Sequence, residues 1–339
     1  MNAAMPNPGL PIVYVFALGG TIAMAPAARV EGVVPTRDAN DLVAAVPRLN
    51  ELAEIRAVSF RRIPSAHLTF DDLEALSEAI GDAEQEGAQG IVITQGTDTI
   101  EETAFALDRI STVDIPVVIT GAMRVPTAAG ADGPGNLLAA VQVALSKDVR
   151  GLGAVVVLND EIHAARFVRK THTSSPAAFA SPGVGPIGLV VENRPRILTR
   201  PPGVAPLRQA RKASPVRTAL VTVALGDDGT LVDLIRDRRF DGLVVEATGG
   251  GHVPEGLADA LERAAKAMPV LLASRTGAGE VLTGTYGFTG GEIDLQKRGL
   301  IRTGMLDGLK SHMLLNLLLR RGLSSRAEII EAFKPWGGG

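Results

Sequence analysis

Short runs of aliphatic and β-branched residues, each followed by a helical pattern, recur along the chain and constrain its fold most strongly. The runs show no alternation of polar and apolar residues, which is typical of parallel strands buried on both faces. Helical patterns separate them, so the order is a series of β-α-β units and predicts an α/β fold. The predicted strands cover residues 12–18, 90–94, 116–120, 154–158, 217–224, 242–246 and 269–273, and the predicted helices cover residues 69–86, 99–110, 136–146 and 255–267.

The chain has 339 residues, which is more than the roughly 250 to 300 that usually share one core. Residues 193–215 are dense in Pro and Arg and follow neither structural period, so they are typical of a linker. We therefore predict an N-terminal domain, 1–194, a linker, 195–215, and a smaller C-terminal α/β domain, 216–339. The larger domain is expected to hold a Rossmann- or flavodoxin-like parallel sheet.

Composition excludes several classes of partner and cofactor. The net charge is -3 and the basic residues are dispersed, so we expect no nucleic-acid partner. The chain has no Cys, and its five His show no paired metal-ligand spacing, so we expect no metal and no cofactor. The apolar run at residues 12–18 is far too short to span a membrane and ends in Gly-Gly-Thr, which favours a cytoplasmic protein without a membrane partner.

Two predicted strands end in glycine followed by threonine. The first ends in Gly19-Gly20-Thr21, and the second in Gln95-Gly96-Thr97-Asp98-Thr99. One interpretation is that the glycines form turns while Thr and Asp cap helices. The other is that the threonine hydroxyls are catalytic. A nucleotide site is disfavoured, because no Gly-Lys-Ser/Thr sequence follows these glycines and no Gly-x-Gly-x-x-Gly sequence begins at Gly249 or Gly277.

A threonine hydroxyl reacts at neutral pH only if a base lies within hydrogen-bond reach. Lys170, in the segment RFVRKTHTS, is a candidate partner, with Asp98 orienting its amine. Taken alone, that lysine is typical of a solvated surface charge. The two threonines together favour a catalytic interpretation.

Several segments in order resemble the bacterial-type L-asparaginase family. They are GGTIA at 19–23, ITQGTDTIEETAFAL at 93–107, GAMR at 121–124, ADGPGNL at 131–137 and KT at 170–171. The resemblance extends from about residue 12 to 335. It implies hydrolysis of a small-molecule amide, L-asparagine with some glutamine, to the acid and ammonia without metal or organic cofactor.

The resemblance also implies roles for individual residues. Thr21 is similar to the nucleophile that forms an acyl-enzyme, and Thr97, Asp98 and Lys170 resemble a second triad that activates a hydroxyl or water. The implied substrate-binding residues are Ser65, Ala66, Gly96, Thr97, Asp98, Ala122, His252 and Glu280. Glu280 corresponds to an acid supplied by a neighbouring subunit, so we expect a homo-oligomer, a dimer of dimers.

Three positions and one loop depart from the family pattern. Leu18 stands where Thr is usual, Ala66 where a polar residue is frequent, and His252 where Asn is common. The loop at residues 24–39 contains no tyrosine, although the family supplies one there beside the nucleophile. We expect this loop to close over the site when substrate binds.

Two alternative functions remain open from the sequence. One is the ammonia-supplying component of a tRNA-dependent amidotransferase, which carries an additional N-terminal domain, whereas the first motif here begins at residue 16. The other is a non-catalytic amino-acid-binding or sensor protein that keeps the fold without the loop tyrosine.

Overall fold

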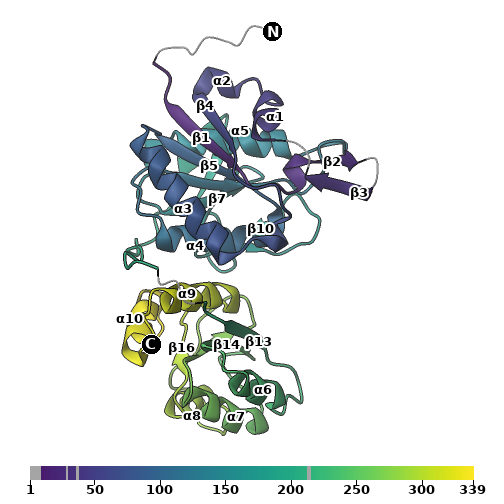
Figure 1. The fold of residues 1–339 in the computed structure, drawn as a ribbon. Helices are drawn as coiled ribbons and strands as arrows, with labels where there is room; N and C mark the ends of the chain where they lie inside the picture. The colour runs from purple at the N-terminus through teal and green to yellow at the C-terminus, as the bar shows by residue number, and fades with distance from the viewer. Residues whose placement is uncertain (1–8, 28–29, 36–37, 212–214) are drawn as a thin grey trace. The chain divides into compact units, whose positions relative to one another are not determined.

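The computed structural model describes residues 9–27, 30–35, 38–211 and 215–339, and for residues 25–35 it describes the backbone alone. The chain divides into two compact units, Met1–Pro206 and Leu207–Gly339 (Figure 1). This division falls within residues 195–215, the segment with linker composition. The α/β class expected from the sequence is confirmed in both units.

The first unit contains an eight-stranded sheet in which five strands run parallel in the order β4-β1-β5-β6-β7. Taken in chain order this is 2-1-3-4-5, the order of flavodoxin-like sheets. Three antiparallel strands, β8, β11 and β12, extend the sheet beyond β7, so it is mixed rather than wholly parallel. The strands are β1 (Ile12–Ala17), β4 (Glu54–Ser59), β5 (Gly90–Thr94), β6 (Val117–Thr120), β7 (Ala154–Leu158), β8 (Glu161–Ala164), β11 (Gly188–Val191) and β12 (Arg194–Ile197).

Helices cover both faces of this sheet, as Figure 1 shows. The helices α3 (Phe70–Gln85) and α4 (Ile100–Ile110) pack on one face, and α1 (Ala39–Ala44), α2 (Leu49–Leu52) and α5 (Gly133–Ala144) pack on the other. Alternate side chains of β5 pack into the two hydrophobic cores. Ile91 and Ile93 lie in the core on one face of the sheet, and Val92 lies in the core on the other. The buried strands therefore have apolar residues on both faces.

Two differences from the predicted elements have local causes. Strand β12 begins at Arg194 and runs through the first residues predicted as linker. Pro195 lacks an N–H and is unfavourable within most strands, so the sequence does not predict a strand here. It is tolerated in β12 because β12 is an edge strand of the sheet. Helix α5 begins at Gly133 instead of residue 136, because Pro134 fits the first helical turn.

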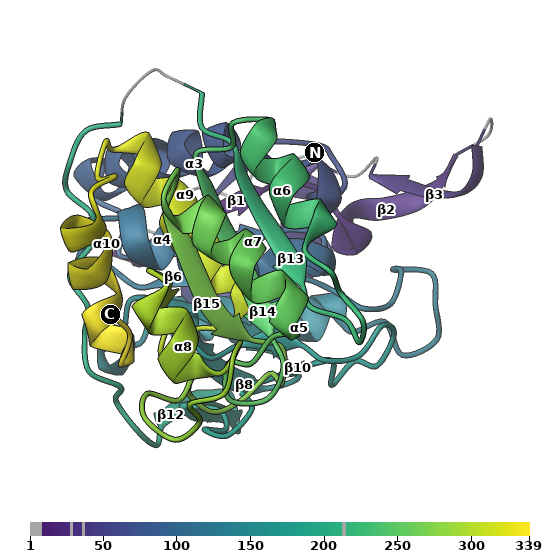
Figure 2. The ribbon, with the colours of Figure 1, turned by 90° about the horizontal axis from the view of Figure 1, so that it is seen from below.

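The second unit has a four-stranded parallel sheet in the order β13-β14-β15-β16. Helices α6 and α7 lie on one face and α9 on the other (Figures 1 and 2). Strand β13 is half-buried rather than fully buried, since it forms an edge of the sheet. The elements are β13 (Thr218–Thr222), α6 (Thr230–Asp237), β14 (Gly242–Ala247), α7 (Glu255–Ala265), β15 (Val270–Ser274), α8 (Glu292–Lys297), β16 (Ile301–Arg302), α9 (Gly308–Arg320) and α10 (Arg326–Phe333).

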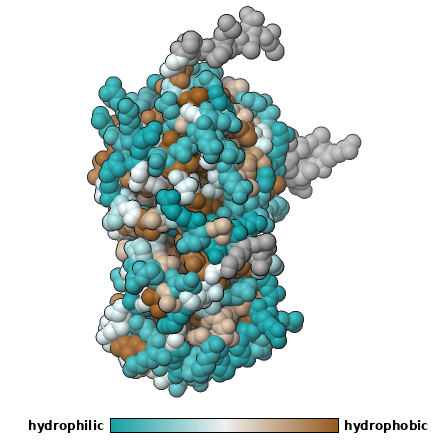
Figure 3. Space-filling view, turned by 60° about the vertical axis from the view of Figure 1, so that its left-hand side comes forward, coloured by the Kyte–Doolittle hydropathy of each residue, from teal (hydrophilic) through white to brown (hydrophobic). Residues whose placement is uncertain are grey.

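Two small antiparallel ribbons form separate two-stranded sheets. One joins β2 (Met24–Ala27) to β3 (Val30–Pro35), and the other joins β9 (Arg169–Lys170) to β10 (Phe179–Ala180). On the face drawn in Figure 3, hydrophilic residues predominate and hydrophobic ones are scattered among them. Among the residues that the structure describes, none of the helices has the length and apolar character needed to cross a membrane.

Candidate active site

The two threonine motifs lie at the topological switch point of the large sheet. Strands β1 and β5 are neighbours, and their chain connections lead to opposite sides, from β1 toward β4 and from β5 toward β6. Open α/β sheets bind ligands at the carboxyl ends of such strands. Thr21 follows the end of β1, and Thr97 follows the end of β5, so both lie at that edge.

Two glycines bring the motifs into direct backbone contact. A Cβ atom added to Gly20 would lie 2.0 Å from the backbone N of Gly96, and Gly20 has a φ of +85°. A Cβ added to Gly96 would in turn lie 2.7 Å from the Oγ of Ser65. Glycine is needed at residue 20, because a side chain has no space there and the φ is unfavourable for other residues. The turns that carry Thr21, Thr97 and Ser65 are thus packed on one another.

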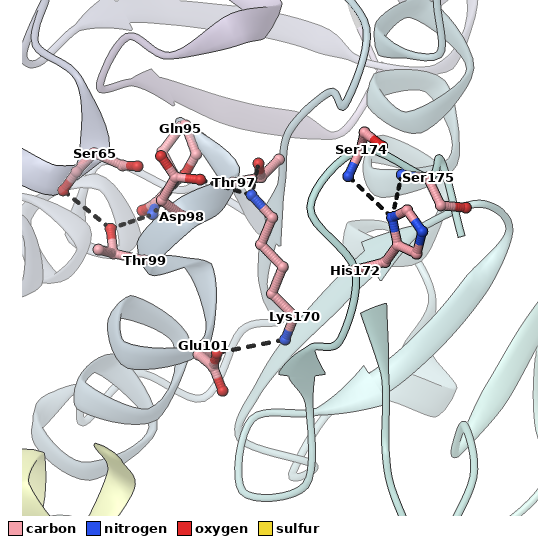
Figure 4. A network of polar contacts seen from close by, with 11 residues as sticks. Ser65, Gln95, Thr97, Asp98, Thr99, Glu101, Lys170, His172, Ser174 and Ser175 are labelled. Carbon is pink, nitrogen blue, oxygen red and sulfur yellow. Dashed lines mark hydrogen bonds and ion pairs between the residues drawn. The ribbon is translucent and has the colours of Figure 1, made fainter. Parts of the chain in front are cut away.

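Lys170 links two of the predicted catalytic residues (Figure 4). Its Nζ donates to Thr97 Oγ1 at 2.9 Å and to Asp98 Oδ1 at 2.6 Å. Thr97 is buried, the Lys170 side chain is 14% exposed, and the Asp98 side chain is 71% exposed. An amine held between a buried hydroxyl and a carboxylate provides a path for a proton.

The hydrogen bonds contradict the interpretation of this segment as ordinary helix caps. Thr99 occupies the N-cap of α4, but its side chain makes no capping hydrogen bond. Instead, Thr99 Oγ1 donates to the backbone O of Ser65 at 3.1 Å. Thr97 and Asp98 point to Lys170, so the side chains of Thr97, Asp98 and Thr99 all make contacts outside the helix.

Ser65 and Ala66 lie in the 3-10 turn η2 (Ser65–His67). Ser65 Oγ is buried and has no hydrogen-bond partner within the described part of the chain, whereas Ala66 is exposed. An unsatisfied buried hydroxyl is costly, and a bound polar group can satisfy it. Ser65 is therefore available for a ligand beside Gly96.

Ala122 is buried in the turn after β6. A Cβ added to Gly121 would lie 3.2 Å from Thr97 Cγ2, so this turn packs against the second threonine. The carboxylate of Asp132 fixes the turn by accepting from the backbone N of Met123 and of Arg124, each at 2.9 Å.

Asn136 secures the same turn, because its Nδ2 donates to Gly121 O at 3.0 Å. Both residues lie in the segment ADGPGNL, which contributes to the family resemblance, but no role of Asp132 or Asn136 was predicted from it. Their spacing of four residues is one helical turn, which was the available signal that they act from one face of a helix.

His252 and Glu280 belong to the second unit. The Nε2 of His252 lies 3.2 Å from Glu292 Oε2, and its ring meets Tyr286 edge to face with a centroid distance of 4.8 Å. Burial opposes ionisation of Glu292, but backbone N–H groups of Tyr286 and Thr285 bind its carboxylate and hold its pKa below the ordinary value. Sequence reasoning did not identify Glu292.

Glu280 is half-exposed, and its Oε1 lies 3.8 Å from Arg302 Nη1. The loop predicted to close, residues 24–39, contains the β2-β3 ribbon, and its side chains from 25 to 37 are outside the described residues. Within the described ranges, no group of three or more His, Asp or Glu side chains is arranged to hold a metal ion.

Comparison with known proteins agrees with this arrangement. The family model "Asparaginase, N-terminal" matches residues 12–203, and "Glutaminase/Asparaginase C-terminal domain" matches residues 217–333. The "Probable L-asparaginase" of Deinococcus radiodurans is 36% identical over 331 residues, 96% of this chain and 97% of that protein. A glutamyl-tRNA(Gln) amidotransferase protein of Methanosarcina mazei is 32% identical over 89% of this chain and 71% of its own length.

A solved structure is similar over nearly the whole chain. The crystal structure of "Probable Cytoplasmic L-asparaginase from Campylobacter jejuni" superposes with a TM-score of 0.83 at 30% identity, covering 96% of this chain and 99% of that one. The resemblance predicted from the sequence segments is therefore confirmed across both units. The chain belongs to the asparaginase family of enzymes.

Proposed function

We propose that this enzyme hydrolyses L-asparagine to L-aspartate and ammonia through an acyl-enzyme on Thr21. The observation that carries the proposal is the position of Lys170, whose amine contacts Thr97 Oγ1 and Asp98 Oδ1 where the Thr21 turn packs on Gly96. The names of the relatives, among them the L-asparaginase of Deinococcus radiodurans, support this substrate.

In the first step, Thr21 Oγ attacks the side-chain carbonyl carbon of the substrate. A carbon–oxygen bond forms, and backbone N–H groups near Ala122 stabilise the oxyanion. The carbon–nitrogen bond then breaks, the threonine proton is passed to the leaving nitrogen, and ammonia departs. The product of this step is an ester on Thr21.

In the second step, water attacks the ester carbon and the Thr97–Lys170 pair accepts a proton of the water. The pair returns this proton to Thr21 Oγ as the bond between that oxygen and the acyl carbon breaks, so the threonine hydroxyl is restored and aspartate leaves. The exposed carboxylate of Asp98 is available for the substrate ammonium. The unpartnered Ser65 Oγ is available for the substrate carboxylate.

Ammonia release from purified protein tests this function. We expect release with L-asparagine, and a loss of at least about a hundredfold in Thr21→Ala, since the nucleophile is absent. Mass spectrometry of protein quenched during turnover should find the ester on the peptide that contains Thr21. Binding of L-asparagine without ammonia release would instead identify a sensor protein.

A panel of amides decides the scope of the activity. Glutamine is included because the C-terminal family model covers glutaminases as well. The amidotransferase alternative is weaker, since the relative of Deinococcus radiodurans and the similar crystal structure are both named L-asparaginase. It predicts that ammonia release depends on a partner protein and a charged tRNA.

We further propose that the enzyme is a cytoplasmic homo-oligomer, a dimer of dimers, in which the second unit of one subunit supplies His252 and Glu280 to the site of another. The half-exposed carboxylate of Glu280 and the exposed rings of Tyr286 and Phe288 support this assembly. Two-fold symmetry makes such a contact reciprocal, with two sites in each dimer.

A further inference from the structure

The proposed mechanism makes no use of His163, an imidazole buried in β8. Its side chain is 1% exposed, its Nδ1 lies 3.0 Å from Ser181 Oγ, and its Nε2 lies 3.2 Å from Glu161 Oε2. A buried polar ring is costly unless both nitrogens are paired, and an aliphatic residue would suit the strand better. The pairing therefore requires an explanation.

His163 points to the face of the sheet on which the β9-β10 ribbon packs. Its neighbours Ile162 and Ala164 belong to the core on the opposite face. Because side chains alternate along a strand, His163 must point the other way. Val168, which directly precedes β9, and Phe179, the first residue of β10, belong to the core on that second face.

A short path connects His163 to Lys170. Ser181 directly follows β10, in which Ala180 pairs with Arg169 and Phe179 pairs with Lys170. Each strand of this ribbon has only two residues, so its own ladder holds it weakly. Contacts outside the ladder therefore help to set the position from which the Lys170 side chain extends. One is the hydrogen bond from the Lys170 backbone N to Glu101 Oε1 at 3.4 Å, and the other is the contact of Ser181 with His163 on the second strand of the ribbon.

The direction of the hydrogen bonds follows from the chemistry of the three groups. A carboxylate can only accept, so Glu161 receives the Nε2–H of a neutral His163. The Nδ1 is then an acceptor and receives the hydroxyl proton of Ser181. Burial lowers the pKa of His163 and outweighs the attraction to Glu161, which favours this neutral state.

We propose that His163 is a positioning residue that holds Lys170 against Thr97 through its hydrogen bond to Ser181. The inference rests on the proposed function only for its kinetic consequence, because the geometry of the ribbon can be measured without turnover. Replacing His163 by Asn or Gln separates its contact with Ser181 from its contact with Glu161. His163→Asn places a polar atom near the position of Nδ1 and keeps the hydrogen bond to Ser181. His163→Gln places one near the position of Nε2 and keeps only the contact with Glu161.

The first measurement is the labelling rate of the Lys170 amine. A water-soluble succinimidyl ester modifies free amines, and peptide mass spectrometry reports the rate for each lysine. In wild type, labelling of Lys170 should be slow, because its amine is mostly buried and donates two hydrogen bonds. We expect Ser181→Ala and His163→Gln to raise this rate several-fold, and His163→Asn to leave it near the wild-type value.

The second measurement is kinetic. Ser181→Ala and His163→Gln should lower kcat about tenfold or more, with little change in KM, because a displaced amine affects chemistry more than binding. In a Lys170→Met background, His163→Gln should lower kcat no further. A purely structural histidine would instead lower the melting temperature of His163→Asn and His163→Gln alike without changing the labelling of Lys170.

The outcomes separate the two proposals. Unchanged Lys170 labelling in both Ser181→Ala and His163→Gln overturns the positioning role. Equal labelling in the Asn and Gln variants overturns it as well. An absence of amide hydrolysis in wild type, with the expected labelling pattern, contradicts the proposed function and leaves the positioning role supported. Ser181→Ala removes one oxygen atom, so it keeps the test valid if the His163 variants do not fold.

Discussion

The Nζ of Lys170, carried by the small β9-β10 ribbon, lies 2.9 Å from Oγ1 of Thr97, which follows β5 of the large sheet. The two side chains come from segments 73 residues apart in the chain. Hydrogen bonds from Lys170 to Thr97 and Asp98 therefore join two separately positioned parts of the first unit.

This contact predicts that Thr97 and Lys170 act as one unit. Thr97→Ala and Lys170→Met should each lower kcat by at least about a hundredfold, and the double variant should be hardly slower than either single one, because each change breaks the same proton path. Lys147→Met removes an exposed lysine and should leave turnover unchanged. Losses that add in the double variant would argue against a shared path.

The close approach of Gly20 to Gly96 predicts a severe effect of one added carbon. Gly20→Ala should lower the free energy of unfolding of the first unit by about 1–3 kcal/mol and abolish turnover, because the new methyl group meets backbone. Gly81→Ala is the matched control. Gly81 lies within α3, where a Cβ atom meets nothing within 4 Å, so this change should stabilise by about 0.5–1 kcal/mol. Urea unfolding and ammonia release measure both variants, and an active Gly20→Ala enzyme would contradict the prediction.

Asp132 is expected to act through the turn that contains Ala122. Asp132→Asn keeps the shape of the side chain but presents an NH2 group to one of the two backbone N–H donors, so one hydrogen bond is lost. The turn should shift, and kcat should fall about tenfold while KM changes little. Asp148→Asn, at an exposed carboxylate, serves as the control. If Asp132→Asn keeps the wild-type kcat, the lost hydrogen bond is not needed to hold the turn.

Burial lowers the pKa of His312 in the second unit below its ordinary value. The unfolded chain then binds more protons than the folded one between the ordinary pKa, about 6.5, and the lower folded-state value. Stability should therefore be fully present above about pH 6.5 and decline below it, by at most about 1.4 kcal/mol per pH unit, until the folded-state pKa is reached. Urea unfolding at about pH 7.5 and about pH 5.5 should show a smaller decline in His312→Asn than in wild type. An equal decline in the two proteins would show that another group titrates.

The shared site proposed for the oligomer predicts complementation between two inactive chains. When Thr21→Ala and Glu280→Ala subunits exchange at random, half of the dimers are mixed, and each mixed dimer has one intact site, so about a quarter of all sites should recover. Ammonia release before and after subunit exchange measures this. Full activity of Glu280→Ala alone would show that the site is complete within one chain.

The buried strands were predictable because the sequence shows them directly. β5, β6 and β7 are apolar on both faces, and each observed strand lies within one residue of its predicted bounds. β4 was missed, since it is half-buried at an edge and its residues Glu54–Ser59 form no apolar run. The two-residue strands β9 and β10 are too short for any period.

The candidate site was predictable only in part. Thr21, Thr97, Asp98 and Lys170 could be proposed because their chemistry and order resemble a known family, and their catalytic roles remain predictions. The spacing of Asp132 and Asn136 signals only a shared helix face. The partners of Asp132 and His163 could not be proposed, because these contacts depend on how segments 8 to 18 residues apart approach one another in space. A single sequence contains no local pattern for such contacts.

The contact between Gly20 and Gly96 has a consequence for the motions of the site. The backbones of these two glycines are in direct contact, with no rotatable side chain between them. The distance between the backbones of Thr21 and Thr97 should therefore change little with temperature or hydrostatic pressure. Lys170 lacks such tight packing of glycine backbones, because it extends from a ribbon of two-residue strands and its backbone N donates to the side chain of Glu101 at 3.4 Å. Amide hydrogen exchange should therefore be slow at residues 96 and 97 and faster at residues 169 and 170, and the mobile partner in proton transfer should be the amine.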